Sequence, residues 1–358
     1  MSADPIQRAP GRRRRVPAAP SRATSVAPSG VAWSRTATID IPIDVRAVPL
    51  RRGGALAWGD DSTTRLFQWR DDHASWQRGP DLPGPAHGAP GVRLADGSVL
   101  IVGAQDGAQV WRWAPGLPAF VPLRPLQVPR HGPAVVPSGA HGALVIGGFG
   151  LDGVAVGAIE VITPQGSFTR GQLLRPRPEP LAVVVPGEVV ILGPNAKGDP
   201  VELPEVWPLG MGDGRLGRAA PEPRWGAAAI AYGETVLRVG GQGVPSGRDR
   251  GFLSQAHIYD PATDLWRSAG RLSSPRSRHR LVPWGRRQCL IIGGESDHPK
   301  VVARVECFDG SGWTRMSTLA VGRIEHDAIA LSDGRVLVIG GRTLGDVPPP
   351  YSELSSQP

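Results

Sequence analysis

Short apolar runs that end in glycine recur along the chain at intervals of 44 to 53 residues. Val99-Leu-Ile-Val-Gly103 is one of them, and Val336-Leu-Val-Ile-Gly340 is another. Four aliphatic residues followed by glycine predict a strand that is buried on both faces, because the run is too short for a helix. The runs end at Gly59, Gly103, Gly147, Gly193, Gly240, Gly293 and Gly340. This regular spacing predicts a repeat protein with about seven units.

A second pattern, an aromatic residue followed six positions later by Leu or Ile, is in phase with these runs. The pairs are Trp33…Ile39, Trp76…Leu82, Phe120…Leu126, Phe168…Leu174, Trp266…Leu272 and Trp313…Leu319. A third apolar segment lies between the two patterns, as in residues 256–261. Each unit therefore contains about four short strands, as a propeller blade does. We expect the aromatic side chains to fill the wedge between neighbouring blades.

The two ends of the repeat region are complementary. The seventh unit begins at Arg323 but lacks its own outer strand, and residues 33–39 form an outer strand without a unit. Pairing the two would leave no unpaired edge, with residues 351–354 as the remaining third strand. The sequence thus predicts an all-β, seven-bladed β-propeller of four-stranded antiparallel blades over residues 31–355, closed by an N-terminal strand. A degenerate segment at 200–220 leaves a count of six blades open.

Composition and charge set a tail apart from this body. Residues 1–30 contain six arginines, one acidic residue and many prolines, which predicts a disordered basic tail. Five of the eight net positive charges lie in this tail, so the body is close to neutral. That balance argues against a basic nucleic-acid-binding domain. From the tail we expect only weak, non-specific binding to nucleic acid or anionic lipid.

The distribution of apolar residues and cysteines bears on the compartment. No segment approaches the ~18–20 apolar residues of a membrane helix, and no apolar secretion signal follows the N-terminal arginines. We therefore expect a cytoplasmic, monomeric protein without a membrane span. Cys289 and Cys307 are symmetric about a turn predicted near His298, so they could face each other across adjacent strands. A reducing cytosol nevertheless predicts free thiols.

Glycine doublets and one aspartate-bearing strand carry a family resemblance. The doublets stand at 147–148, 240–241, 293–294 and 340–341, and Tyr259-Asp260-Pro261 precedes Trp266. Over residues 31–341 the chain resembles the kelch-repeat β-propellers, which include the galactose oxidase propeller. The resemblance implies the fold but no single activity, since scaffolds and enzymes share it. Galactose oxidase itself would imply copper held by two Tyr and two His, which the three tyrosines of this chain are not placed to supply.

Sequence motifs for cofactors are weak. Two GxGxxG matches, at 148–153 and 212–217, do not open a helix and are interpreted as turns. The eight histidines show no zinc-binding spacing. Glu325 and Asp327 could share one face of a strand, whereas His326 could not, and we interpret them as hydrogen-bonding partners for the channel. We predict neither a metal nor another cofactor.

Arginine and histidine recur where the chain enters the first strand of each unit. Such an arginine could hydrogen-bond to backbone carbonyls and brace the blades, or it could form a cationic rim that binds carboxylates through its planar fork. The candidate binding residues are Arg130, His131, Arg177, Arg224, Arg276, Arg278, His279, Arg323 and His326. The rim predicts a non-catalytic protein-binding scaffold for an acidic partner. The alternative is an enzyme, of isomerase or oxidase type, acting on a sugar-like small molecule in the central channel.

Overall fold

The described part of the chain consists of strands, turns and loops, without a helix. The computed structural model describes residues 31–38, 44–70, 73–139, 142–195, 202–243, 251–345, 347–349 and 351–358. The predicted tail at 1–30 and residues 244–250 of the long loop at 242–255 lie outside these ranges. Within them, no helix is long and apolar enough to cross a membrane.

Seven four-stranded antiparallel sheets form from the described residues, and we number them in chain order. Sheet 1 contains β2 (Arg46–Pro49), β3 (Gly54–Trp58), β4 (Thr63–Arg70) and β5 (His73–Asp81). Sheet 2 contains β6 (Gly91–Arg93), β7 (Val99–Ala104), β8 (Gln109–Trp113) and β9 (Val121–Pro122). Sheet 3 contains β11 (Ala134–Ser138), β12 (Gly142–Ile146), β14 (Ala158–Thr163) and β15 (Gly166–Gln172). Sheet 4 contains β16 (Leu181–Val185), β17 (Glu188–Leu192), β18 (Glu205–Pro208) and β19 (Arg215–Leu216).

The last three sheets complete the series. Sheet 5 contains β21 (Ala228–Tyr232), β22 (Thr235–Val239), β25 (Gln255–Asp260) and β26 (Leu265–Arg271). Sheet 6 contains β27 (Arg280–Pro283), β28 (Cys289–Ile292), β29 (Val305–Phe308) and β30 (Trp313–Arg315). Sheet 7 contains β31 (Asp327–Ala330), β32 (Val336–Ile339), β33 (Tyr351–Ser355) and β1 (Trp33–Thr38). Two small loop sheets join β10 (Arg130–His131) with β13 (Phe149–Gly150), and β20 (Arg224–Trp225) with β23 (Gln242–Gly243) and β24 (Gly251–Phe252).

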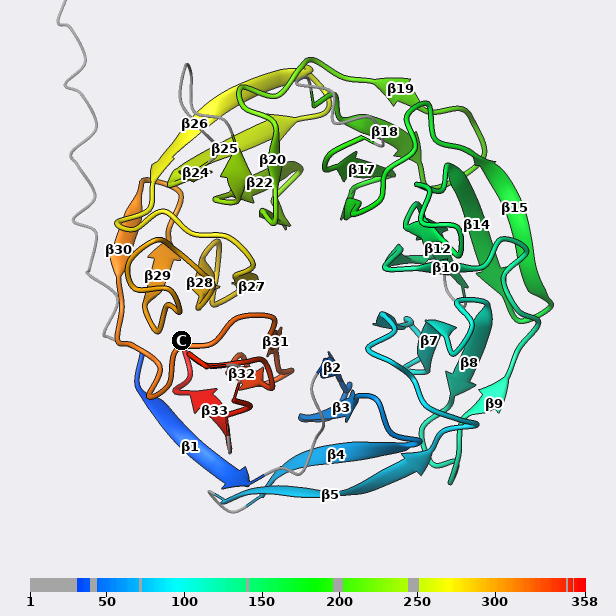
Figure 1. Ribbon diagram of the computed structural model, residues 1–358, viewed down its shortest axis with the longest axis horizontal. Helices are drawn as coiled ribbons and strands as arrows, with labels where there is room; N and C mark the ends of the chain where they lie inside the picture. Colours follow the sequence, from blue (N-terminus) through cyan, green and yellow to red (C-terminus); the bar gives the residue numbers. More distant parts are fainter. Residues whose placement is uncertain are drawn as a thin grey trace, which may run out of the picture.

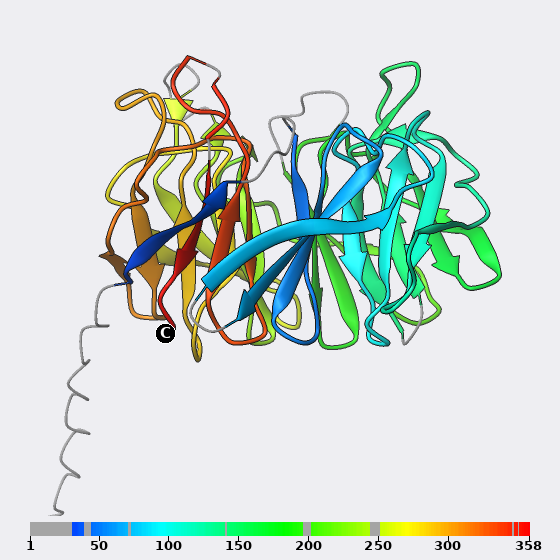
Figure 2. The same ribbon diagram turned by 90° about the horizontal axis from the view of Figure 1, so that it is seen from below.

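The sheets stand around a common axis, as Figure 1 shows. The first strand of each sheet lies innermost and contacts the first strands of its neighbours, and β31 contacts β2, so that the ring is closed. Seen from the side, the strands run between two loop faces (Figure 2). This all-β arrangement of four-stranded antiparallel sheets is consistent with a β-propeller.

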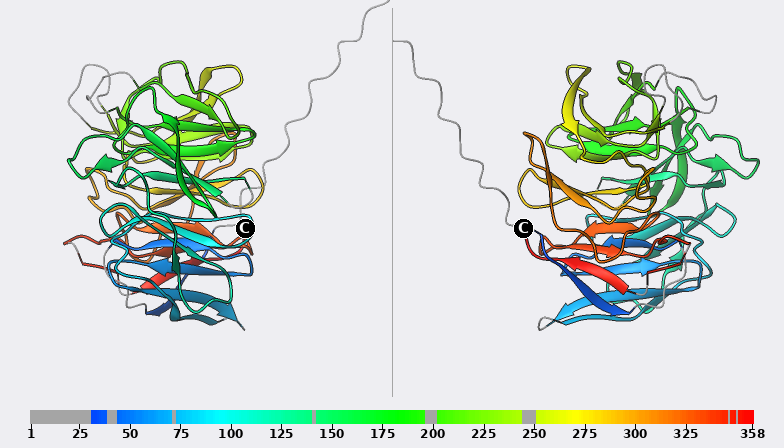
Figure 3. Two further views of the ribbon diagram at one scale, coloured as in Figure 1. Left: turned by 90° about the vertical axis from the view of Figure 1, so that its right-hand side faces the viewer. Right: turned by 60° about the vertical axis from the view of Figure 1, so that its left-hand side comes forward.

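The N-terminal strand completes the last sheet, as the sequence predicted. β1 pairs with β33 in antiparallel register, with Trp33 opposite Ser355 and Arg35 opposite Glu353. Figure 3 shows the blue β1 beside the red β33 although they come from opposite ends of the chain. β33 in turn pairs with β32, so it is the third strand of this sheet. The last unit of the ring therefore contains both ends of the described chain.

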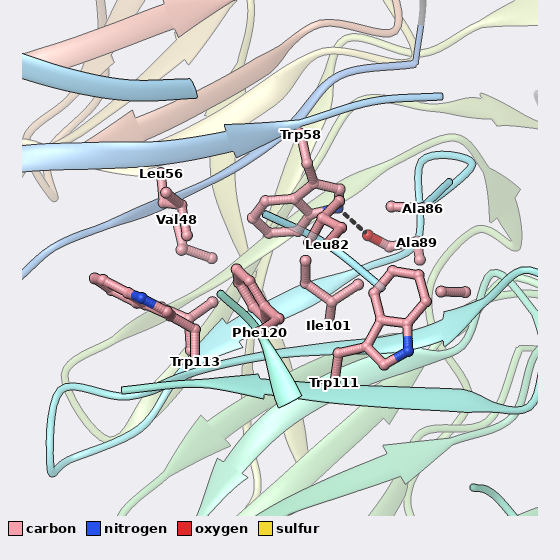
Figure 4. Packing of buried hydrophobic residues seen from close by; sticks show 12 residues of the cluster. Val48, Leu56, Trp58, Leu82, Ala86, Ala89, Ile101, Trp111, Trp113 and Phe120 are labelled. Atoms are coloured by element: carbon pink, nitrogen blue, oxygen red, sulfur yellow. Dashed lines mark hydrogen bonds between the residues drawn. The ribbon is translucent and has the colours of Figure 1, made fainter. Parts of the chain in front are cut away.

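The hydrophobic core is divided into clusters that lie between neighbouring sheets. Between sheets 1 and 2, Trp58, Trp111 and Phe120 pack together, and the Trp58 indole N–H donates to the Ala89 carbonyl at 2.9 Å (Figure 4). Because every sheet has neighbours on both faces, its second strand reads as a continuous apolar run. The expected aromatic packing fails in sheet 3, where Phe168 is 40% exposed and Leu174 52% exposed.

The glycines that follow the second strands allow close packing between sheets. Gly293 has a φ of 62°, and a Cβ there would lie 2.7 Å from both the Arg323 carbonyl oxygen and the His326 ring. Any other residue would therefore combine an unfavourable backbone with a clash. The first glycine of this doublet is a close-approach position between sheets 6 and 7.

The two cysteines occupy adjacent strands but point to opposite faces of sheet 6. Cys307 pairs with Leu290 and Cys289 with Phe308, so the expectation that the thiols face each other is wrong. Cys289 packs between sheets 5 and 6, and Cys307 between sheets 6 and 7. The predicted free thiols are confirmed.

We expect neither thiol to react with maleimide in the folded protein. Both side chains are buried, and burial raises the pKa of Cys289 and raises that of Cys307 to about 11, so little thiolate is present at pH 8. Thiol counting by mass spectrometry before and after unfolding in urea will show no label and then two labels. Rapid labelling of the folded protein, or an unlabelled cysteine after unfolding, would contradict this.

Candidate functional site

The arginines at the entries of sheets 3 to 7 are buried, with exposed fractions of 0–2%. They are Arg130, Arg177, Arg224, Arg276 and Arg323. In four of these sheets the guanidinium forms an ion pair with a buried glutamate on the third strand of the same sheet. The pairs are Arg130–Glu160, Arg177–Glu205, Arg276–Glu306 and Arg323–Glu353.

Sheet 6 shows what such a pair does. Arg276 Nη2 lies 2.5 Å from Glu306 Oε1, and Arg276 Nη1 donates to the Arg304 carbonyl at 2.8 Å. Glu306 Oε2 accepts the backbone N–H of Ser273 at 2.8 Å, in the connection that arrives from sheet 5. Burial lowers the pKa of Arg276 to about 10, which leaves it protonated at neutral pH. The pair therefore ties the connection between sheets to the inner strands.

Sheet 5 departs from this pattern. His257 stands where sheets 3, 4, 6 and 7 have glutamate, and its Nδ1 is 3.4 Å from Arg224 Nη2. Arg224 pairs instead with Glu222 at 2.5 Å. Burial, reinforced by the nearby Arg224 and Arg238 charges, lowers the pKa of His257 to about 4, so the imidazole is neutral at physiological pH.

These contacts correct the predicted cationic rim. Buried guanidinium groups that are engaged with glutamates and carbonyls cannot reach an acidic partner, so these five arginines brace the ring, as the other interpretation proposed. His279 and His326 are also buried, at 2% and 0% exposed, and burial lowers the pKa of His279 to about 3. Of the nine candidates, His131 and Arg278 are the two exposed ones.

A cavity of about 900 Å³ lies at the end of the ring where the innermost strands begin. Four of the nine predicted residues line it, namely His131, Arg224, Arg278 and His279. The charged lining residues that the structure describes are Asp44, Arg46, Glu179, Arg224, Arg278, Arg280, Glu325 and Arg342. The lining thus contains five arginines and three carboxylates, so the cavity has an excess of positive charge.

Three of these charged residues occupy equivalent positions with an unusual backbone. Asp44, Arg278 and Glu325 stand two residues before the innermost strand of sheets 1, 6 and 7, with φ values of 68°, 51° and 54°. The equivalent residues of sheets 2, 3 and 5 are Gly88, Gly132 and Gly226, also with positive φ. Glycine adopts this conformation without strain, whereas other residues incur a cost of about 1–3 kcal/mol.

Ion pairs link the three strained residues along the cavity wall. Glu325 Oε1 lies 2.7 Å from Arg278 Nη1, and Glu325 Oε2 lies 3.3 Å from Arg342 Nε. Arg342 Nη2 reaches to 3.9 Å from Asp44 Oδ1, and Arg278 Nε to 3.4 Å from Glu295 Oε1. Sheets 6, 7 and 1 are consecutive in the ring, so these contacts form one continuous row of ion pairs.

A second row of charges lies two residues further along the same strands, on the same face. It comprises Arg46, Arg280 and Asp327, with Arg280 Nε 3.4 Å from Asp327 Oδ1. Asp327 Oδ2 accepts the backbone N–H of Ala47 at 2.9 Å. The corresponding residues of sheets 2 to 5 are Pro90, Ala134, Leu181 and Ala228. At this position the innermost strands of sheets 6, 7 and 1 therefore carry charged residues, whereas those of sheets 2 to 5 carry apolar ones.

Sequence reasoning named Arg278 and Glu325 but missed Asp44, Arg46, Arg280 and Arg342. The signal that could have found Asp44 is the repeat itself: a charged residue stands where other repeats have glycine. Arg342 follows a glycine doublet and gives no comparable signal.

Comparison with known proteins establishes the fold. A fungal alcohol oxidase of the AA5 family, solved in complex with copper, is 16% identical with a TM-score of 0.73, over 92% of this chain and 76% of that one. The structure of YjhT is 14% identical with a TM-score of 0.60, over 79% of this chain and all of the other. Both fit a kelch-like propeller. No protein-family model and no curated protein sequence matches the chain.

The prediction of a non-catalytic protein-binding scaffold for an acidic partner is contradicted. The similarity with the highest TM-score reported above is to an oxidase, which favours the enzyme alternative. The burial of the arginines gives the physical reason, because the rim on which the scaffold prediction rested does not form.

The described residues do not fit a copper centre of the galactose oxidase type. Tyr232 O–H donates to the Arg287 carbonyl at 2.9 Å, Tyr259 O–H donates to Asp264 at 2.8 Å, and Tyr351 belongs to β33. None of these tyrosines lines the cavity. Within the described ranges, no group of three or more His, Cys, Asp or Glu side chains is placed to hold a metal ion.

Proposed function

We propose that this chain is a seven-bladed kelch-type propeller enzyme that isomerises a sugar-like small molecule in the cavity. The observation that carries the proposal is the set of charged residues at positive φ on the cavity wall, Asp44, Arg278 and Glu325. Backbone strain of this kind concentrates at functional sites. Glycine at the equivalent positions of other sheets indicates that the fold itself does not require the strained residues.

The two-sided wall suits a polyhydroxylated ligand. Trp225, Phe149 and Leu181 line the cavity opposite the row of ion pairs. Aromatic and aliphatic surfaces can pack against the C–H faces of a sugar. Carboxylates and guanidinium groups can accept and donate hydrogen bonds to its hydroxyls. An alcohol oxidase with the same fold supports a hydroxyl-bearing substrate.

We assign proton transfer to Glu325. Its carboxylate would accept the proton of the anomeric hydroxyl while the ring C–O bond breaks, and the ring oxygen would take up a proton, which gives the open-chain carbonyl form. Closure by the reverse steps on the other face of the carbonyl gives the second anomer, so that no co-reactant is consumed. Arg278 and Arg342 contact its two oxygens and fix its orientation. Asp44, at the other side of Arg342, positions that arginine.

The test is an isomerisation assay with the isosteric variant Glu325→Gln. The purified protein is incubated with a panel of reducing sugars, and interconversion of their isomers is followed by NMR. We expect Glu325→Gln to lower the catalysed rate by about 10²-fold or more, because a general base contributes that much. Glu234→Gln, in an exposed turn at the other end of the strands, is the matched control and should keep the wild-type rate.

Two results would overturn this proposal. One is an equal rate for the wild type and Glu325→Gln with every active sugar. The other is peroxide formation from alcohols on addition of Cu(II), with no isomerisation, which would show that the protein is an oxidase. Melting temperatures of both variants check that a lost rate does not reflect lost folding.

A further inference from the structure

Two arginines of the cavity have only one carboxylate near them among the described residues, and it contacts just one of the two. Arg46 and Arg280 lie on the charged side, and Asp327 contacts Arg280 through Oδ1 while its Oδ2 is engaged by a backbone N–H. Arg46 has one hydrogen bond, to the Val45 carbonyl at 3.4 Å, and no carboxylate within ion-pair distance in the described part of the chain. Arg280 Nε donates to the His326 carbonyl at 2.9 Å, so both Nη groups of Arg280 and most N–H donors of Arg46 face the cavity without a partner among the described residues.

We propose that Arg46 and Arg280 form an anion-binding clamp for a carboxylate or phosphate group of the cavity ligand. The proposal rests on the proposed function only in that the ligand occupies the same cavity. Guanidinium is the side chain best suited to this role, because its planar fork matches the oxygens of both anions. On the opposite side of the cavity the Arg224 guanidinium is already engaged with Glu222 and with two backbone carbonyls, so it offers the anion no second open fork.

The electrostatics of the pair favour an anion between them. Burial lowers the pKa of Arg280. The Asp327 carboxylate raises this pKa, and repulsion from the Arg46 charge lowers it further. A bound carboxylate or phosphate would remove this repulsion and supply the second negative charge that the pair lacks.

The clamp also orients the ligand relative to Glu325. Arg280 begins its strand two residues after Arg278, which contacts Glu325, and two residues span at most about 7 Å. An anionic group at the clamp would therefore place the sugar ring between the clamp and the Glu325 carboxylate. The inferred substrate class is an acidic or phosphorylated sugar, held at its anionic end and transformed at the other.

The experiment measures binding of three probes by isothermal titration calorimetry at low salt: D-glucuronate, D-glucose 6-phosphate and D-glucose. We expect one of the two anions to bind at least 10-fold more tightly than glucose. Arg46→Gln should remove that preference, because it removes one of the two guanidinium groups. The variant should still fold, since Arg46 makes no ion pair in the described structure. Arg51→Gln, in the exposed turn after β2, makes the same charge change and should bind like the wild type.

Each outcome supports or overturns the anion-binding clamp. A preference for glucuronate assigns a carboxylate, a preference for glucose 6-phosphate assigns a phosphate, and either supports the clamp if Arg46→Gln removes it. Equal affinity for all three probes overturns the clamp but leaves the isomerase proposal intact, as does a preference that survives in Arg46→Gln. Absence of binding by any probe, together with absence of isomerisation, overturns both. If Arg46→Gln fails to fold, Arg46→Lys keeps the charge without the fork and should weaken anion binding.

Discussion

Glu306→Ala should lower the free energy of unfolding by about 3–5 kcal/mol, because it leaves the buried Arg276 charge without its carboxylate. Both side chains are almost completely buried, at 1% and 0% exposed. The substitution also removes the acceptor of the Ser273 backbone N–H, which holds the connection from sheet 5. Urea unfolding followed by tryptophan fluorescence measures the loss.

Two further variants separate the charge from the packing. Glu234→Ala removes an exposed glutamate and should change stability by no more than about 0.5 kcal/mol. The double variant Arg276→Met with Glu306→Leu should recover part of the loss, since a buried ion pair replaced by apolar residues is often neutral or stabilising. A loss below about 1 kcal/mol for Glu306→Ala would show that the pair does not brace the ring.

Deleting residues 1–38 should destabilise the whole ring, whereas deleting residues 1–30 should leave the melting temperature unchanged. The longer deletion removes β1 and exposes the edge of β33, whose Leu354 is now 0% exposed. It also removes the Val31 and Trp33 side chains from the cluster between sheets 6 and 7. Burial of an apolar side chain contributes about 1.5–3 kcal/mol when it is complete, as for Val31, and less for the partly buried Trp33.

Differential scanning calorimetry of the two truncations is the measurement, with the full-length protein as reference. Removing only residues 1–30 keeps every described strand. Equal melting temperatures for the two truncations would contradict closure of the ring by β1.

The fold could be predicted from the sequence because its signals are local. A run such as Val336–Ile339 followed by glycine identifies a buried strand by composition alone, and the outer strand without a unit at 33–39 identified the closing strand. These features follow from burial on both faces and from the need to avoid free edges.

The partners of the entry arginines could not be predicted in the same way. Glu306 and Glu353 look like ordinary polar residues of a third strand, and each pairs with an arginine 30 residues earlier. A separation of 30 residues in the sequence does not indicate a contact until the positions of the strands are known. For the same reason the sequence named Arg276 and Arg323 as rim residues, because it shows a charge but not whether the charge is buried.

We call the charged residues of sheets 6, 7 and 1 at the cavity the charged wall. Its recognition depends on the backbone φ angle, which the sequence does not show directly. Asp44 and Glu325 become comparable only when the φ of each residue before an innermost strand is known. Arg46 and Arg280 likewise acquire a role only when sheets 1, 6 and 7 are brought side by side around the ring.

The charged wall has a consequence for synthesis of the protein on the ribosome. Its residues come from the beginning of the chain, at 44–46, and from its end, at 278–342. The third strand of sheet 7 is β33, at residues 351–355, and it carries the pairing with β1 that closes the ring. A nascent chain or an N-terminal fragment therefore holds only one half of the wall. The wall can assemble only after residue 342 has left the ribosome, so a product that terminates before residue 278 will contain its residues at 44–46 and none of the others.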